Sequence, residues 1–253
     1  PESASEEEVA LHQKRMKDSK DYLAAQQNAT EQAHRLRQII QQRGGIPVEG
    51  AIALMQTDSV LQGPKLFKMH CCGCHPHADA EGNGFSGPDE GPAAPNLYGF
   101  ASREWLTGVM DPEQFVSRNY FGATAHSEDL MMGYLPEHVA FLNDEGKEQM
   151  KTVIAALSAE AALVSQAELD AKDAEAGNLD KGRELISTAL SASEDAESEY
   201  SCADCHKFHD EGDLGSAPDL TGYGSEAWLV ELIANVEHER FYESNNDRMP
   251  IFN

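Results

Sequence analysis

Two short cysteine–histidine motifs constrain this chain more than any other feature of its sequence. Residues 71–75 read Cys-Cys-Gly-Cys-His and residues 202–206 read Cys-Ala-Asp-Cys-His, so both fit the pattern C-x-x-C-H. Two thiols three residues apart on one helical turn can form thioether bonds to both vinyl groups of one porphyrin, and the histidine that follows can present its imidazole to the iron. This pattern is the attachment signal for c-type haem. The sequence therefore predicts two haem c groups, attached through Cys71, Cys74, Cys202 and Cys205, with His75 and His206 as axial iron ligands.

Other chemistry of the cysteines must be weighed against haem attachment. A lone C-x-x-C can be a redox dithiol or half of a zinc site. Zinc needs four ligands, and neither motif has a second cysteine pair near it in the sequence. Cys72 lacks the two-residue gap to Cys74, so we interpret it as a small apolar filler of the attachment loop. An alternative attachment or a redox-reactive role for Cys72 stays open.

A second signal is an internal repeat that follows each motif. Residues 94–106 recur as residues 217–229, with identical Ala-Pro, Leu, Gly, Ser, Trp and Leu in the same register. Both tryptophans of the chain, Trp105 and Trp228, belong to this repeat. A repeat at this spacing indicates that the chain contains two copies of one haem-binding unit.

Each copy resembles a class I cytochrome c, in which a helix, C-x-x-C-H, a Pro-x-Leu-x-Gly loop, a further helix and a distal methionine follow one another. The resemblance implies that the carbonyls of Pro95 and Pro218 accept the proton of each ligand histidine's second ring nitrogen, which fixes the ring. It also implies that Trp105 and Trp228 pack near the haem edges. Ordinary turn roles for the prolines and plain core roles for the tryptophans are the alternatives.

The same resemblance implies a methionine as the sixth iron ligand. Met249 stands before Pro250 in the usual form of the distal-ligand loop. Aligning residues 129–134 with residues 247–252 places Met131 opposite Met249, with Met132 in place of the proline. Met132 and His126 stay open as alternatives for the first iron. Three histidines near the motifs are interpreted as proximal-side residues with surface or haem-propionate roles (His70, His77 and His209). Four others are interpreted as solvent-facing (His12, His34, His138 and His238).

The expected fold is all-α, with two tandem class I cytochrome c-like haem domains after an N-terminal helical arm. We expect the arm at residues 1–44, the first domain at 45–164, and a helical connector with the second domain at 165–253. Helices are predicted over residues 5–43, 58–69 and 145–163, and over a connector from 165 to 190 that includes the second haem-leading helix. Residues 191–201 are predicted to form a surface loop. Because the sequence holds no closing helix for the second domain after Met249, we expect the first unit, the connector, the arm or a partner chain to cover it.

The charge of the chain limits its partners. Its 44 acidic and 19 basic side chains give a formal net charge of −25, which disfavours nucleic acid and anionic membrane surfaces. No apolar run approaches the ~20 residues that span a bilayer. With both faces of each iron closed by ligands, the expected function is electron transfer rather than catalysis. An acidic surface near a haem edge would steer basic redox partners.

A narrower resemblance concerns the two Ser-x-x-Trp-Leu segments, residues 202–209 and the tail at residues 246–250. They are similar to bacterial dihaem cytochromes c that are fused to, or encoded with, the cytochrome b of bc-type quinol-oxidising complexes. This implies electrons received from a Rieske-type centre or a neighbouring haem, a soluble acceptor, and a periplasmic or extracytoplasmic location. It also implies that the arm leads from a membrane helix outside this sequence. A free periplasmic shuttle and a dihaem peroxidase with an exchangeable sixth position remain the alternatives.

Overall fold

The computed structural model describes residues 6–88, 91–194, 200–215 and 217–252. It is mostly helical, with 57% helix and 3% strand, so the expectation of an all-α fold is confirmed at this level. The chain forms two compact units, Pro1–Cys71 and Cys72–Asn253. Each unit is described by itself. Every helix in the described ranges is too short or too polar to cross a membrane.

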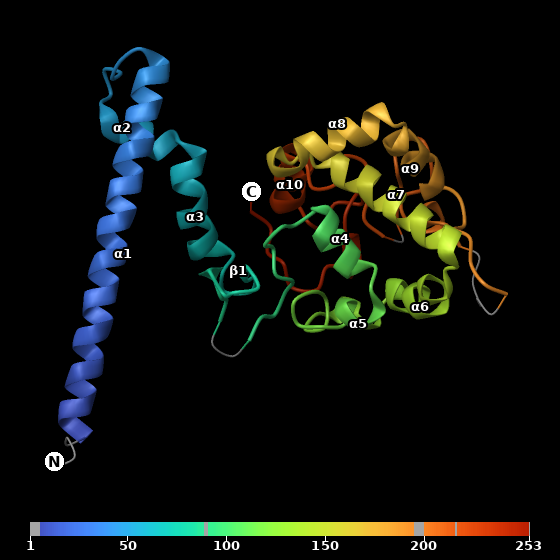
Figure 1. The fold of residues 1–253 in the computed structure, drawn as a ribbon, viewed down its shortest axis with the longest axis horizontal. Coiled ribbons are helices and arrows are strands. Elements are labelled where there is room, and N and C mark those ends of the chain that lie inside the picture. Colours follow the sequence, from blue (N-terminus) through green and yellow to red (C-terminus); the bar gives the residue numbers. More distant parts are fainter. Residues whose placement is uncertain (1–5, 89–90, 195–199, 216, 253) are drawn as a thin grey trace. The chain divides into compact units, whose positions relative to one another are not determined.

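The first unit consists of α1 (Glu6–Arg43), α2 (Ala51–Thr57) and α3 (Ser59–His70). The long rod of α1 is almost entirely exposed, and α2 lies beside its C-terminal end (Figure 1). As the sequence predicts, α1 ends at Arg43, just before Gly44, whose φ of 76° is in the left-handed region that suits the residue after a helix. Asp58 caps α3 by accepting the N–H of Leu61, and it also binds the guanidinium of Arg35 at 2.7 Å.

The second unit contains the remaining helices and one short hairpin. The hairpin pairs β1 (His77–Ala78) with β2 (Gly84–Phe85) in antiparallel orientation. The α-helices are α4 (Arg103–Val109), α5 (Pro112–Phe115), α6 (Leu130–Glu137), α7 (Asp144–Glu160), α8 (Ala167–Glu175), α9 (Asn178–Ile186) and α10 (Glu226–Ala234). Single 3-10 turns lie at Ala125–Glu128, Val139–Phe141, Val164–Gln166, Cys202–Asp204 and Glu243–Asn245.

The repeated sequence has a repeated structure. In both copies the serine of Ser-x-x-Trp caps the next helix: Ser102 accepts the N–H of Trp105, and Ser225 accepts the N–H of Trp228. Backbone hydrogen bonds are also repeated. Leu97 donates to the carbonyl of Pro76, as Leu220 donates to Lys207, and Asn96 donates to Asn119, as Asp219 donates to Arg240. The two copies therefore share one local fold around the Pro-x-Leu-x-Gly loop.

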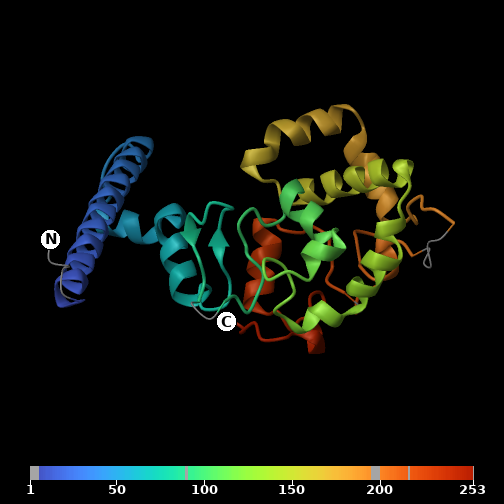
Figure 2. The same cartoon turned by 60° about the horizontal axis from the view of Figure 1, so that its bottom comes forward.

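Helix α7 of the first copy packs against α9, the helix that leads into the second C-x-x-C-H motif (Figure 1, Figure 2). The contact is close at Gly182 of α9. A Cβ atom there would lie 2.3 Å from the Thr152 carbonyl oxygen and 2.7 Å from the Ala156 Cβ. The sequence left four possible covers for the second copy, and in the structure α7 of the first copy packs on its leading helix α9.

Two hydrophobic clusters form the core of the second unit. The larger joins residues of both copies, among them Trp105, Leu135, Val153, Ile186 and Phe208. The smaller belongs to the second copy and consists of Trp228, Leu232, Val236 and Phe241. Phe100 and Tyr223 pack against both clusters, so they join the two copies into one body. The predicted domain ranges, divided at residue 164, stay a prediction.

Several expectations about local structure need correction. The connector is not one helix over 165–190: it divides into α8 and α9 at Gly177, whose φ of 73° ends the first helix. The closing helix α7 ends at Glu160 rather than at residue 163. His138 is not solvent-facing but 1% exposed, because its ring stacks on Tyr134 with 5.2 Å between centroids. The predicted loop at 191–201 is without helix where it is described; residues 195–199 lie outside the described residues.

Candidate functional site

The two motif histidines have the same hydrogen bond. His75 Nδ1 lies 2.8 Å from the carbonyl oxygen of Pro95, and His206 Nδ1 lies 2.8 Å from that of Pro218. A carbonyl can only accept, so Nδ1 carries the proton in both rings and Nε2 keeps its lone pair. This is the contact that the family resemblance implies for a ligand histidine.

Burial favours the neutral form of both imidazoles. Burial lowers the pKa of His75, and the bond to the Pro95 carbonyl opposes this in part. Burial likewise lowers the pKa of His206, opposed by the bond to Pro218. A neutral imidazole with a free Nε2 lone pair is the form that binds a metal.

A tight turn positions the second pair of cysteines. Ser201 and Asp204 form a capping box around Cys202–Asp204, with the Ser201 N–H donating to the Asp204 carboxylate at 2.6 Å. His206 then donates its backbone N–H to the Cys202 carbonyl at 2.8 Å, which keeps both cysteines and the histidine on one turn. Burial raises the pKa of the Cys202 thiol to about 11, and it also raises that of Cys205.

The first pair of cysteines is divided between the two compact units. Cys71 follows α3 in the first unit and donates its N–H to the Phe67 carbonyl. Cys74 belongs to the second unit, where its carbonyl accepts the N–H of Ala93. Cys72 is half-buried, and its role as a filler stays a prediction.

The two tryptophans hold the loops that carry the prolines. Trp105 Nε1 donates to the Asn96 carbonyl at 3.1 Å, and Trp228 Nε1 donates to the Asp219 carbonyl at 2.8 Å. Asn96 and Asp219 directly follow Pro95 and Pro218. Each buried indole therefore fixes the peptide next to the proline that orients the motif histidine.

The two copies meet at equivalent residues. The rings of Phe100 and Tyr223, which occupy matching positions of the repeat, are 5.4 Å apart between centroids. A Cβ added at Gly224 would lie 2.3 Å from the Cβ of Ala101, its counterpart in the first copy. This contact of like with like indicates an approximate two-fold relation between the loops. We did not predict this interface between the copies from the sequence. The one local sign of it is the small residue that both copies have at this position, Ala101 and Gly224.

This interface completes a row of aromatic rings. The ring centroid of Phe100 lies 4.7 Å from that of Trp105, and the ring centroid of Tyr223 lies 5.0 Å from that of Trp228. The order of the rings is therefore Trp105, Phe100, Tyr223, Trp228. The tryptophan at each end donates a hydrogen bond to the residue that follows the proline in contact with the motif histidine. We call these four residues the aromatic bridge.

Arg240 is a further residue that sequence reasoning missed. Its Nε donates to the Asp219 carboxylate at 2.8 Å, and a second guanidinium nitrogen donates to the Thr221 carbonyl at 2.6 Å. The Asp219 side chain is 7% exposed, so Arg240 supplies the charge that a buried carboxylate needs. Together they brace the loop after Pro218.

The three candidate methionines are half-buried in different surroundings. Met131 and Met132 lie in the first turn of α6, rather than in a loop, and pack against the larger cluster. Met249 packs against the smaller cluster, and Asn246 brackets it by accepting its N–H and donating to its carbonyl.

His126, the alternative ligand for the first iron, contacts Asp129 and Tyr242. Its Nδ1 lies 2.6 Å from Asp129, and its ring lies 5.0 Å from that of Tyr242. His209, expected at the surface, is exposed, and its Nε2 lies 3.3 Å from the Glu160 carboxylate.

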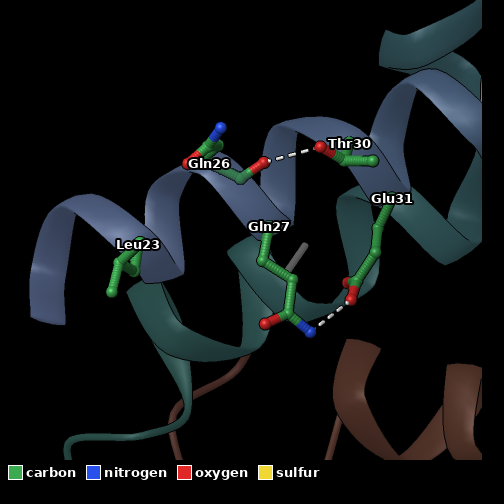
Figure 3. Close-up of a pocket in the computed structure, with 5 residues that line it drawn as sticks. All are labelled: Leu23, Gln26, Gln27, Thr30 and Glu31. Atoms are coloured by element: carbon green, nitrogen blue, oxygen red, sulfur yellow. Dashed lines mark hydrogen bonds between the residues drawn. The ribbon is translucent and has the colours of Figure 1, made fainter.

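A surface hollow on α1 lies outside these motifs. Figure 3 shows its lining residues, Leu23, Gln26, Gln27, Thr30 and Glu31, all from this one helix. Two hydrogen bonds run within the helix at this place, from Gln27 to Glu31 and from Thr30 to the Gln26 carbonyl. The hollow contains none of the predicted haem-binding residues. In the described ranges, no group of three or more His, Cys, Asp or Glu side chains is placed to hold a metal ion.

Comparison of the chain with protein-family models, with curated proteins and with solved structures finds no match.

Proposed function

We propose that this chain is an electron-transfer protein that carries two covalently bound haem c groups in two tandem class I cytochrome c-like units. The observation that carries the proposal is the duplicated histidine–proline contact within a duplicated C-x-x-C-H motif. The residues fit the cofactor because each histidine has Nδ1 anchored and Nε2 left for a metal. When bound, the haem iron supplies a centre that accepts and releases one electron.

Each group of predicted site residues would have its own role in binding the haems. Cys71, Cys74, Cys202 and Cys205 would form the thioethers, and His75 and His206 would bind the irons on one side. Pro95 and Pro218 orient these histidines and raise their basicity as ligands. Met131 and Met249 would bind on the other side, and a thioether sulfur there raises the reduction potential.

The aromatic bridge supports exchange of electrons within the chain. It runs from the peptide after Pro95 to the peptide after Pro218 through packed rings. Electrons tunnel more readily through packed atoms than across gaps, so a continuous row of rings between the two motifs favours a short relay. The protein's contribution to such a cofactor is position and environment.

The partners that we propose follow from charge and resemblance. A net charge of −25 favours basic surfaces on soluble redox partners, with association that weakens as salt increases. The family resemblance adds cytochrome b and a Rieske protein of a bc-type respiratory complex. We infer a periplasmic or extracytoplasmic location, where c-type haem is attached.

The experiment is a count of haems and thiols on the chain produced with a c-type haem maturation system. The proposal predicts a mass increase of two haems and one remaining free thiol, that of Cys72. Cys71→Ser with Cys74→Ser should lose one haem, and Cys202→Ser with Cys205→Ser the other. The matched control Cys72→Ser should keep both. A chain that keeps five reactive thiols after maturation would contradict the proposal.

A further inference from the structure

The segments that bear the candidate methionines lie together, although they come from different copies. Ala125, ahead of α6, donates its N–H to the carboxylate of Asp247 at 3.2 Å. The ring of His126 packs on that of Tyr242. The methionine-bearing segments of the two copies are therefore in contact with each other.

Helix α6 of the first copy and the second motif share a buried cluster. Cys202 and Tyr134, one turn after Met131, pack against the same cluster of buried side chains. Burial raises the pKa of Tyr134, and the charges of Cys202, Cys205 and Asp204 raise it further. The chain after α6 keeps the same neighbour, because Leu142 pairs with Ala192 and Asn143 binds Ser191, on the segment that leads from α9 to Cys202.

The tail of the second copy runs to the first motif instead. The Arg248 guanidinium donates to the carbonyl of Ala93 at 3.2 Å and to that of Ala123 at 2.8 Å. Ala93 in turn donates its N–H to the carbonyl of Cys74. The residue before Met249 is therefore two hydrogen bonds from the first motif. Past Met249 the tail returns to its own copy, where Phe252 donates its N–H to the carbonyl of Ile233.

We propose that the two copies exchange their distal ligands: Met131 of the first copy serves the haem at Cys202–His206, and Met249 of the second copy serves the haem at Cys74–His75. The inference rests on the proposed function, because it assigns ligands to its two haems. It also agrees with the packing of α7, the helix after Met131, against α9, the helix before the second motif. A closing helix and a distal methionine from the first copy then complete the second site.

The exchange can be tested on chains that carry one haem. With Cys71→Ser and Cys74→Ser only the second haem remains, and with Cys202→Ser and Cys205→Ser only the first. The readouts are the near-infrared methionine-to-iron absorption band of the oxidised protein and the ring-current-shifted methionine methyl resonance of the reduced protein. If neither chain carries haem, the proposed function itself fails, so the two failures are distinguishable.

In the chain with only the second haem, we expect Met131→Leu to abolish both signals completely and Met249→Leu to leave them unchanged. In the chain with only the first haem, we expect the reverse. Met132→Leu is made in parallel, and complete loss through it in place of Met131→Leu equally supports exchange, because both lie on α6. Loss of both signals through Met249→Leu in the chain with only the second haem would overturn the proposal. It would also be overturned if none of the three substitutions changed either signal.

Because removal of one haem removes part of the core, a second measurement uses the intact protein. Nuclear Overhauser contacts identify which haem lies next to each shifted methionine methyl group. We expect the methyl of Met249 to contact the haem whose thioethers belong to Cys71 and Cys74. Contact with the haem of Cys202 and Cys205 would overturn the exchange.

Discussion

Replacing Gly182 with alanine tests the packing of α7 on α9, which brings the closing helix of one copy to the leading helix of the other. A Cβ at this position would lie 2.3 Å from a backbone oxygen of α7 and 2.7 Å from the Cβ of Ala156. Real Cβ atoms do not approach so closely, and neither neighbour is the end of a flexible side chain. One helix must therefore move away from the other.

The magnitude is the difference of two effects. Overpacking a tight contact costs about 1–3 kcal/mol, whereas alanine in a helix interior gains up to about 1 kcal/mol over glycine. We expect Gly182→Ala to lower the free energy of unfolding by about 1–2 kcal/mol. For a unit of this size that corresponds to a fall in Tm of roughly 2–8 °C.

The matched control is Gly133→Ala in α6, where an added Cβ meets nothing within 4 Å. It should stabilise the protein by about 0.5–1 kcal/mol. Tryptophan fluorescence during thermal unfolding is the assay, because both tryptophans of the chain lie in the second compact unit. A Gly182→Ala protein as stable as the Gly133→Ala protein would refute the α7–α9 contact.

Three further substitutions test other contacts. Ser225→Ala removes the side chain that accepts a backbone N–H in the first turn of α10, and should cost about 1 kcal/mol in thermal unfolding; an unchanged Tm would count against the cap. Arg240→Leu leaves the carboxylate of Asp219 buried without its cation and should cost roughly 1.5–3 kcal/mol in urea unfolding, part of which Asp219→Asn should restore in the double variant. The bond to Arg35 lowers the pKa of Asp58, so this carboxylate stabilises the first unit above its unfolded pKa, and the contribution disappears as pH falls through the lower folded pKa. Asp58→Asn should weaken the acid-dependent loss of helical circular dichroism, and an identical pH profile would contradict the pairing.

Features set by short sequence separations were predictable. The C-x-x-C-H frames are local patterns, and the family resemblance implied the proline carbonyls that hold His75 and His206, at most 20 positions away. The serine caps before both tryptophans are equally local, although we did not name them from the sequence. The ends of α1 were predictable for the same reason, because Gly44 and Gly45 stop a helix locally.

Features set by distant residues were not. That α7 covers α9 depends on the fit of Gly182 against Thr152 and Ala156, which no local pattern states. The burial of His138 depends likewise on what packs around the end of α6, since histidine has no strong preference for the surface or the core. The division of the connector at Gly177 is the exception. Gly177 is a local signal for a helix end, but the helix-favouring residues on both sides of it led us to predict one continuous helix.

The central claim is that two irons, each bound by a motif histidine and a methionine, pass electrons through this chain. Its most direct test is the coordination state of both haems in the intact oxidised protein, measured by electron paramagnetic resonance together with a titration with cyanide. The account predicts two low-spin, six-coordinate signals that resist cyanide, and two one-electron reduction steps in a redox titration. A five-coordinate or water-bound iron at rest, or a chain without haem, would contradict it.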